Sequence, residues 1–226
     1  MTSPTGEAAR PLSQLHDVPM CRQRIDPGEW AECGGAALGD RAEWSDRACG
    51  MAALRMILLA YLGDAPPLTE LVVTGVREGA LTGRGWLHAG IASLASRFGI
   101  PAVAEAAAAD ELPARLKDAP LIISVTEKFP EDGRKGGHLV VARGTSESAD
   151  GSLDILIRDP SAWGQDHDRV TLARLSASYS GRCITFAPMP APSGSRLSRC
   201  STLREIPPRS EPAHCAEHPA RPPGRQ

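Results

Sequence analysis

The chain has 226 residues and a formal net charge of −2, a size that suits one domain with a substantial core. The near-neutral charge gives no electrostatic reason to expect binding to nucleic acid or to an anionic membrane surface. No apolar run approaches the roughly 20 residues that span a bilayer, and the N-terminus lacks the basic and apolar segments of a secretory signal. We therefore expect a cytoplasmic protein without a membrane segment.

Three regions follow from composition. Residues 1–18 are polar and rich in turn formers, so we expect a flexible N-terminus. Residues 19–188 should form one domain, which begins with an ordered but irregular lead-in that carries Trp30 and Trp44. Residues 189–226 should be a disordered tail rich in proline and arginine, because such a segment cannot bury enough apolar surface to order itself.

The first half of the domain carries helical patterns. "CGMAALRMILLAYLG" has apolar residues at helical spacing, and Gly63 can end this helix. Further helices are predicted at Leu68–Gly79, with Thr69 near its start, and at Gly85–Ile100, which Gly99 closes. "ADELPARLKDAP" predicts a short helix or turn.

The pattern then changes to short runs rich in β-branched residues. Each run is bounded by Gly, Asp or Pro, as strands are. The predicted strands are Leu121–Thr126, His138–Gly144, Leu153–Asp159 and Arg182–Pro188. "TLARLSASYSG", between the last two, is a helix candidate. Helices followed by strands predict an α+β fold, in which N-terminal helices pack against a C-terminal antiparallel sheet.

Cysteine usage favours neither a metal site nor a disulfide framework. The six cysteines show no CxxC pair and no zinc-finger spacing. They are Cys21, Cys33, Cys49, Cys183, Cys200 and Cys215. A bridge between Cys21 and Cys33 is compatible with their spacing, but the cytosol keeps thiols reduced.

Cys49 stands where the polar stretch "EWSDRA" meets the apolar helix. Ser45 or Asp46 could cap this helix, which would place the thiol in its first turn. There the helix dipole and unpaired N–H groups favour the thiolate and can stabilise an oxyanion. Gly50 would let a substrate approach the backbone closely. A small buried structural cysteine is an equally good interpretation of this stretch alone.

His138 and Asp159 are weak signals separately and a stronger one together. His138 follows two glycines at the start of a strand, where a solvent-facing role is the ordinary one, and Asp159 could be a plain turn signal before Pro160. However, the point midway between them falls inside the polar turn "TSESADGS". In an antiparallel hairpin the two residues would then lie opposite or diagonal to each other, within reach of a hydrogen bond. The carboxylate could hold the imidazole in one orientation.

The order Cys, His, Asp resembles that of papain-like cysteine peptidases, and most closely a bacterial group related to the bacteriocin-processing, double-glycine leader peptidases. The matching stretches span about Val18–Pro188. They are "ACGMAALRMIL", "GWLHAGIASLASRFGI", "GGHLVVARG", "IRDPSAWG" and "VTLARLSASYSGRCITF". The resemblance implies a papain-like fold and a Cys49–His138–Asp159 triad.

The resemblance also implies a glutamine that contributes to the oxyanion hole. In the bacteriocin-processing enzymes this glutamine lies six residues before the cysteine, where the present chain has Glu43, which has no amide donor. Gln23, in "VPMCRQRIDPGEW", matches a glutamine-bearing segment of the group and is the residue we favour. The alternative is that Gln23 is an ordinary loop residue. We expect His88 and Trp86 to contribute to core packing or to line a cleft.

These residues predict a cysteine peptidase or amide hydrolase that forms a thioester on Cys49 and acts on a peptide or protein. The chemistry requires no metal or organic cofactor. Two alternatives stay open: the same triad could pass the acyl group to an amine, as in a transferase, or the domain could be an inactive relative that binds peptides. The sequence leaves the oligomeric state undetermined.

Overall fold

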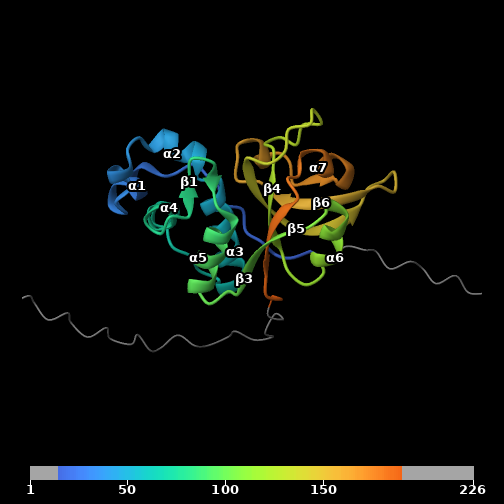
Figure 1. Cartoon of the computed structure of the whole chain (residues 1–226), viewed down its shortest axis with the longest axis horizontal. Helices are drawn as coiled ribbons and strands as arrows, with labels where there is room; N and C mark the ends of the chain where they lie inside the picture. The colour runs from blue at the N-terminus through green and yellow to red at the C-terminus, as the bar shows by residue number, and fades with distance from the viewer. Residues whose placement is uncertain (1–14, 190–226) are drawn as a thin grey trace, which may run out of the picture. The chain divides into compact units, whose positions relative to one another are not determined.

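A computed structural model describes residues 15–189. Helices fill the first half of this region and strands the second, as predicted, and the two halves lie side by side (Figure 1). The helices are α1 (Pro27–Glu32), α2 (Arg41–Arg47), α3 (Cys49–Leu62), α4 (Leu68–Arg77), α5 (His88–Arg97), α6 (Leu112–Arg115) and α7 (Leu172–Ser178). Short 3₁₀ turns are η1 (Gly35–Leu38), η2 (Ala109–Glu111) and η3 (Trp163–Gln165).

Six strands form one antiparallel sheet in the order β3-β8-β4-β5-β6-β7. Their bounds are β3 (Ala102–Ala106), β4 (Leu121–Val125), β5 (His138–Glu147), β6 (Leu153–Arg158), β7 (Arg169–Thr171) and β8 (Arg182–Phe186). A separate pair joins β1 (Leu81–Thr82) to β2 (Gly85–Trp86). The fold is therefore α+β, as predicted, with the cysteine-bearing helix against an antiparallel sheet.

The sheet separates two hydrophobic clusters. One cluster joins helices α3, α4 and α5 to residues of one sheet face, such as Ile122 and Val141. The other lies on the opposite face and includes Val140, Ile123 and Leu175 of α7. Successive strand residues point to opposite faces, so every residue of β4 is buried on one side or the other.

Helix α3 is the central element of the first cluster. It is apolar around most of its circumference, which is the pattern of a helix buried on several sides. It contacts α4, α5 and β5, and Gly63 ends it in the left-handed conformation with φ of 77°, as predicted. The first residue of this helix is thereby fixed against the strand that begins with His138.

Several expectations about local structure were wrong. Ser45 and Asp46 do not cap α3, because they lie inside the separate helix α2, whose cap is Asp40. Ala48 precedes α3 without a side-chain cap hydrogen bond. The predicted helix at 85–100 begins only at His88, because the residues before it pair as β2. Strands β3 and β7 were not predicted.

The ends of the domain are described in part. The sequence placed the start of the domain at residue 19, but Leu15 already forms a bridge with Gly144 and Val18 is fully buried. Residues 1–14 and the predicted tail beyond Met189 lie outside the described residues. Within the described range no helix is long and apolar enough to cross a membrane. Cys21 and Cys33 are free thiols, so the bridge considered above is not formed.

Candidate active site

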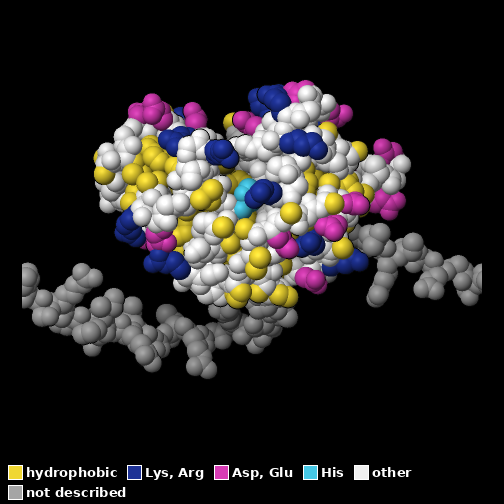
Figure 2. All heavy atoms as spheres, viewed as in Figure 1, with side chains coloured by type: hydrophobic (Ala, Val, Ile, Leu, Met, Phe, Trp, Pro, Cys, Tyr) yellow, Lys and Arg dark blue, Asp and Glu magenta, His cyan; other side chains and the backbone are white. Residues whose placement is uncertain are grey.

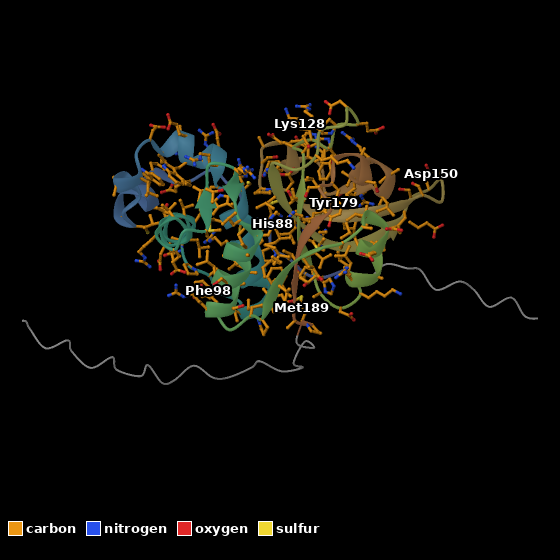
Figure 3. All side chains as sticks on the ribbon, viewed as in Figure 1. His88, Phe98, Lys128, Asp150, Tyr179 and Met189 are labelled. Atoms are coloured by element: carbon orange, nitrogen blue, oxygen red, sulfur yellow. The ribbon has the colours of Figure 1, made fainter. Side chains whose placement is uncertain are left out.

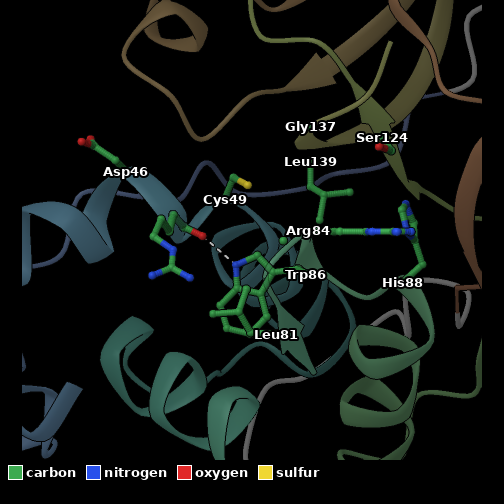
Figure 4. A pocket seen from close by; sticks show the side chains of 11 residues that line it. Asp46, Cys49, Leu81, Arg84, Trp86, His88, Ser124, Gly137 and Leu139 are labelled. Carbon is green, nitrogen blue, oxygen red and sulfur yellow. Dashed lines mark hydrogen bonds between the residues drawn. The ribbon is translucent and has the colours of Figure 1, made fainter. Parts of the chain in front are cut away.

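Cys49 lies at a break between two helices. Helix α2 ends at Arg47, and α3 begins at Cys49 after Ala48, whose ψ of 4° is not helical. The indole Nε1 of Trp86 donates to the carbonyl oxygen of Arg47 at 2.6 Å (Figure 4). In a continuous helix that oxygen would pair with the N–H four residues later, so the indole stabilises the break. Cys49 is thus the first residue of a new helix, where backbone N–H groups lack intrahelical acceptors.

Gly50 serves close packing here. A Cβ at this position would come within 2.8 Å of the Trp86 side chain and 3.0 Å of the Leu139 side chain. The expectation that Gly50 leaves room for a substrate is therefore wrong, because these two side chains occupy the space. The contact presses the start of α3 against both β2 and β5. It fixes the distance between the thiol and the strand that carries His138.

His138 begins β5 directly after two glycines with positive φ. Gly136 and Gly137 have φ of 78° and 94°, a region that L side chains rarely adopt, so glycine lets the chain turn sharply into the strand. The N–H of Gly136 donates to the Ser178 carbonyl at 3.1 Å, which anchors this turn to the end of α7. His138 is 7% exposed. Its ring is therefore held at the edge of the core.

Asp159 follows the last residue of β6 and is completely buried. Its Oδ1 lies 2.7 Å from His138 Nε2 and also accepts the backbone N–H of Ser161 at 2.8 Å. Gly164 packs directly on the backbone of Asp159, where any Cβ would collide with it. The predicted hydrogen bond between the histidine and aspartate side chains is present. Gly164 is a supporting residue that the sequence analysis did not single out, although it lies in the stretch "IRDPSAWG".

The strand register explains how residues 21 positions apart meet. Val141 pairs with Arg158, but after an irregularity at Arg143 the pairing shifts, and Gly144 faces Leu156. Extending the first pairing places Asp159 across from Val140, so Asp159 lies diagonal to His138. A diagonal pair on one face is within reach of two medium-length side chains. The interaction is thus the diagonal one of the two predicted geometries.

The electrostatics of this pair favour an imidazolium. Burial alone lowers the pKa of His138, but hydrogen bonds and charge from Asp159 and Cys49 outweigh it and raise this pKa to about 10. Burial raises the pKa of Asp159, yet its interactions with His138 and the Ser161 backbone lower it overall. Cys49 lines a pocket together with Gly137 and Leu139, the two neighbours of His138, so the thiol lies close to the ring. Since Nε2 is bound to Asp159, Nδ1 is the ring nitrogen left for the thiol.

Gln23 is hydrogen-bonded to the segments that precede Cys49 and follow Asp159. Its side-chain Nε2 donates to the carbonyl oxygen of Asp46 at 3.4 Å, three residues before Cys49. Its backbone N–H donates to the carbonyl oxygen of Pro160 at 2.9 Å. Gln23 is therefore tied both to the end of α2 and to the turn after Asp159. Glu43, six residues before Cys49, lies on the exposed side of α2.

Two pockets, which share Asp46, open in this region, and Cys49 lines one of them. The Trp86 pocket, of about 220 Å³, has eleven lining residues, which include Cys49, Leu139 and His88 (Figure 4). The Gln23 pocket, of about 280 Å³, is lined by Gln23 and the turn after Asp159. His88 lies at the centre of the face drawn in Figure 3. The expected cleft-lining role therefore holds for Trp86 and His88. Among residues 15–189 no group of three or more His, Cys, Asp or Glu side chains could hold a metal ion.

Comparisons with known proteins agree with this arrangement. The sequence profile of the peptidase C39 family matches residues 42–191, more than half of the chain, and this range contains Cys49, His138 and Asp159 but not Gln23. No curated protein sequence matches the chain.

Solved structures with similar folds are also peptidases. A double glycine motif protease from an AMS/PCAT transporter, in complex with its leader peptide, has a TM-score of 0.50 and 20% identity over 77% of this chain and 94% of that chain. The peptidase domain of Streptococcus ComA has a TM-score of 0.47 and 20% identity, with coverage of 63% and 93%. At these identities the first similarity supports the fold alone. The family match and the fold together show that this chain belongs to the peptidase C39 family and is a papain-like cysteine peptidase.

Proposed function

We propose that the chain hydrolyses a peptide bond with a catalytic triad of Cys49, His138 and Asp159. The observation that carries this proposal is the buried 2.7 Å hydrogen bond between the His138 ring and Asp159 Oδ1, next to a pocket that Cys49 lines together with Gly137 and Leu139, the two neighbours of His138. A nucleophile, a base and an orienting carboxylate in that order are what nucleophilic catalysis by cysteine requires. All three side chains are under 10% exposed, so little water competes for their hydrogen bonds.

The proposed reaction has two stages. The Cys49 thiolate attacks the carbonyl carbon, and the imidazolium of His138 gives its proton to the departing amine, which leaves a thioester on Cys49. His138, now neutral, then takes a proton from a water molecule that attacks the thioester, and the acid product leaves as the thiolate and imidazolium form again. The raised pKa of His138 supports this scheme because it favours the protonated ring in the resting enzyme.

Stabilisation of the oxyanion is assigned to the backbone N–H of Cys49 and to the amide of Gln23. The support is the position of Cys49 at the start of α3 and the attachment of Gln23 to Asp46 and Pro160, on either side of the triad. The loss of one such donor in a related type of site slows the reaction by about 10²–10³. We therefore expect Gln23→Ala to lower kcat by about that factor. Gln165→Ala is the matched control, because Gln165 lines the same pocket and bonds the Ser161 carbonyl.

We propose a peptide or protein as the substrate, since the similar AMS/PCAT protease was solved with a leader peptide. Transfer of the acyl group to an amine uses the same thioester and needs a separate test. Substrate peptides would be incubated with and without an added amine, and the products weighed by mass spectrometry. Predominant amide product would replace the hydrolase proposal by a transferase.

Alkylation tests the nucleophile without a known substrate. Iodoacetamide near neutral pH should modify Cys49 faster than the buried Cys183 and faster than the more exposed Cys33, as followed by peptide mass spectrometry. Cys49→Ala should abolish cleavage of a mixed peptide library, and Cys183→Ala should not. The proposal fails if Cys49 reacts no faster than the other two thiols and Cys49→Ala still cleaves.

A further inference from the structure

Both pockets are basic: the Trp86 pocket, which Cys49 lines, and the Gln23 pocket, which shares Asp46 with it. The Trp86 pocket carries Arg47 and Arg84, and the Gln23 pocket carries Arg22 and Arg24. Asp46 lines both pockets and is the single carboxylate among their lining residues. Four arginines against one aspartate leave a formal surplus of three positive charges among the residues that line the two pockets. The whole chain has a net charge of −2, so this local surplus is opposite in sign to the rest of the protein.

These arginines are not neutralised within the described part of the chain. No ion pair there joins any of the four to an Asp or Glu. The guanidinium of Arg47 instead stacks 4.6 Å from the centre of the Trp44 ring, which holds the group in place without removing its charge. In the space-filling view, Lys and Arg side chains stand on both sides of the hollow between the helical half and the sheet, together with Asp and Glu side chains near its upper rims (Figure 2). A peptide that crosses this hollow would pass between them.

Arg84 and His88 form the far wall of the Trp86 pocket. The Arg84 side chain extends toward the His88 ring (Figure 4). His88 Nε2 is buried and has no hydrogen-bond partner among the described residues. Burial, with a smaller contribution from Arg182, lowers the pKa of His88, so the ring is neutral at physiological pH. The pocket therefore contains a guanidinium group and an imidazole nitrogen without a partner among the described residues. The guanidinium group could bind a carboxylate, and the imidazole nitrogen could form a hydrogen bond to a polar group beside it.

We infer that the two pockets select peptides that carry acidic side chains next to the scissile bond, Arg84 in one pocket and Arg22 or Arg24 in the other binding the carboxylates. This inference rests on the proposed peptidase function. The physical reason is the planar fork of N–H donors on arginine, which matches a carboxylate and binds it with charge-assisted hydrogen bonds. Like-charged lysine or arginine side chains at the same substrate positions would be repelled.

Retention of peptides on an inactive variant tests the inference. Cys49→Ala protein would be immobilised and offered an equimolar library in which Asp and Glu, or their amides Asn and Gln, occupy positions around a fixed centre. We expect the acidic members to be enriched about three- to tenfold, the size of one or two partly screened ion pairs. Arg84→Glu and Arg24→Glu, each in the Cys49→Ala background, should abolish the enrichment. Arg77→Glu, an exposed position on α4 that lines neither pocket, should retain it.

A substrate-free measurement checks the same charges in the active protein. The ratio of Cys49 alkylation rates by anionic iodoacetate and neutral iodoacetamide reports the local potential. It should fall about three- to tenfold in Arg84→Glu and stay unchanged in Arg77→Glu. Equal retention of acidic and amide peptides, or the same alkylation ratio in both variants, would overturn the inference. Wild-type protein that cleaves none of the library would instead contradict the proposed function, while selective retention of acidic peptides would leave the inference standing.

Discussion

Substitutions of Asp159 can separate two effects of its carboxylate on His138: it orients the imidazole ring, and its negative charge stabilises the protonated ring. Two donors converge on Asp159 Oδ1, namely the Nε2 side of the histidine ring and the Ser161 backbone N–H. An asparagine at this position would place its oxygen there, because its NH₂ group would face two other donors. Asp159→Asn should therefore keep the ring in position and remove only the charge. Asp159→Ala should remove both.

The magnitudes follow from the kind of hydrogen bond that is lost. A hydrogen bond to a charged group contributes about 1.5–3 kcal/mol, against about 1 kcal/mol for a neutral one. With a tenfold rate change per 1.36 kcal/mol, Asp159→Ala should lower kcat/KM by roughly 10- to 150-fold, and Asp159→Asn, which keeps a neutral hydrogen bond, by about 2- to 30-fold. The asparagine variant should also lose activity at lower pH than the wild type as pH rises, because removal of the carboxylate lowers the pKa of His138.

The assay is kcat/KM for a cleaved library peptide, measured across the pH range alongside the rate of Cys49 alkylation. Asp154→Asn is the matched control: Asp154 is a buried carboxylate on β6 that bonds the Ser148 hydroxyl, away from the triad. Equal losses in Asp159→Asn and Asp159→Ala would refute the separation of orientation from charge. Full activity of Asp159→Ala would refute the role of Asp159 altogether.

Three further outcomes are expected. Gly164→Ala should lower both activity and stability by about 1–3 kcal/mol, because its methyl group collides with the backbone of Asp159; thermal unfolding checks this, and Gly83→Ala, which has open space, should be neutral. Trp86→Phe should lower stability by about 1 kcal/mol through the lost indole hydrogen bond at the break before α3, and an unchanged urea midpoint would contradict that assignment. The third outcome concerns the pH dependence of the His138–Asp159 ion pair. The folded protein raises the pKa of His138, so the contribution of this residue to the free energy of unfolding is complete below the unfolded pKa of about 6.5 and is lost as pH rises through the folded pKa. It lowers the pKa of Asp159, so that contribution is present above the unfolded value of about 3.9 and is lost as pH falls. The free energy of unfolding that Asp159→Ala removes, measured by urea denaturation, should therefore be largest between these two pH values, and a pH-independent difference would argue against the ion pair.

The relation between His138 and Asp159 could be predicted because it depends on local features. A polar turn midway between two apolar runs determines the register of a hairpin to within one or two residues. That precision is enough to predict that His138 and Asp159 lie close to each other. The irregularity at Arg143 could not be predicted, since nothing in "HLVVARG" marks one residue as extra. Its effect was small because it lies on the turn side of the pair.

Elements fixed by distant contacts were not predictable. "AVAEA" is rich in alanine and glutamate, which favour helix, yet it forms β3 because Ala102 pairs with Phe186 at the other end of the domain. The stretch before Cys49 holds capping residues at several positions. Asp40 is the residue that caps a helix, and Ser45 lies inside that helix, because a separate helix α2 forms before Cys49. The hydrogen bond from Trp86 to Arg47 stabilises the break between α2 and α3.

The position of the thiol relative to its base is the part of the site that depends most on packing. Cys49 belongs to the helical half and His138 to the sheet, and 89 residues of chain separate them. At this point the two halves meet where the Leu139 side chain packs against Gly50, beside Trp86. A Cβ at position 50 would lie 2.8 Å from the Trp86 side chain and 3.0 Å from the Leu139 side chain, so these side chains or the start of α3 would have to shift. The glycine after the cysteine therefore lets α3 pack closely on Leu139 of β5, which brings the thiol near the strand that begins with His138.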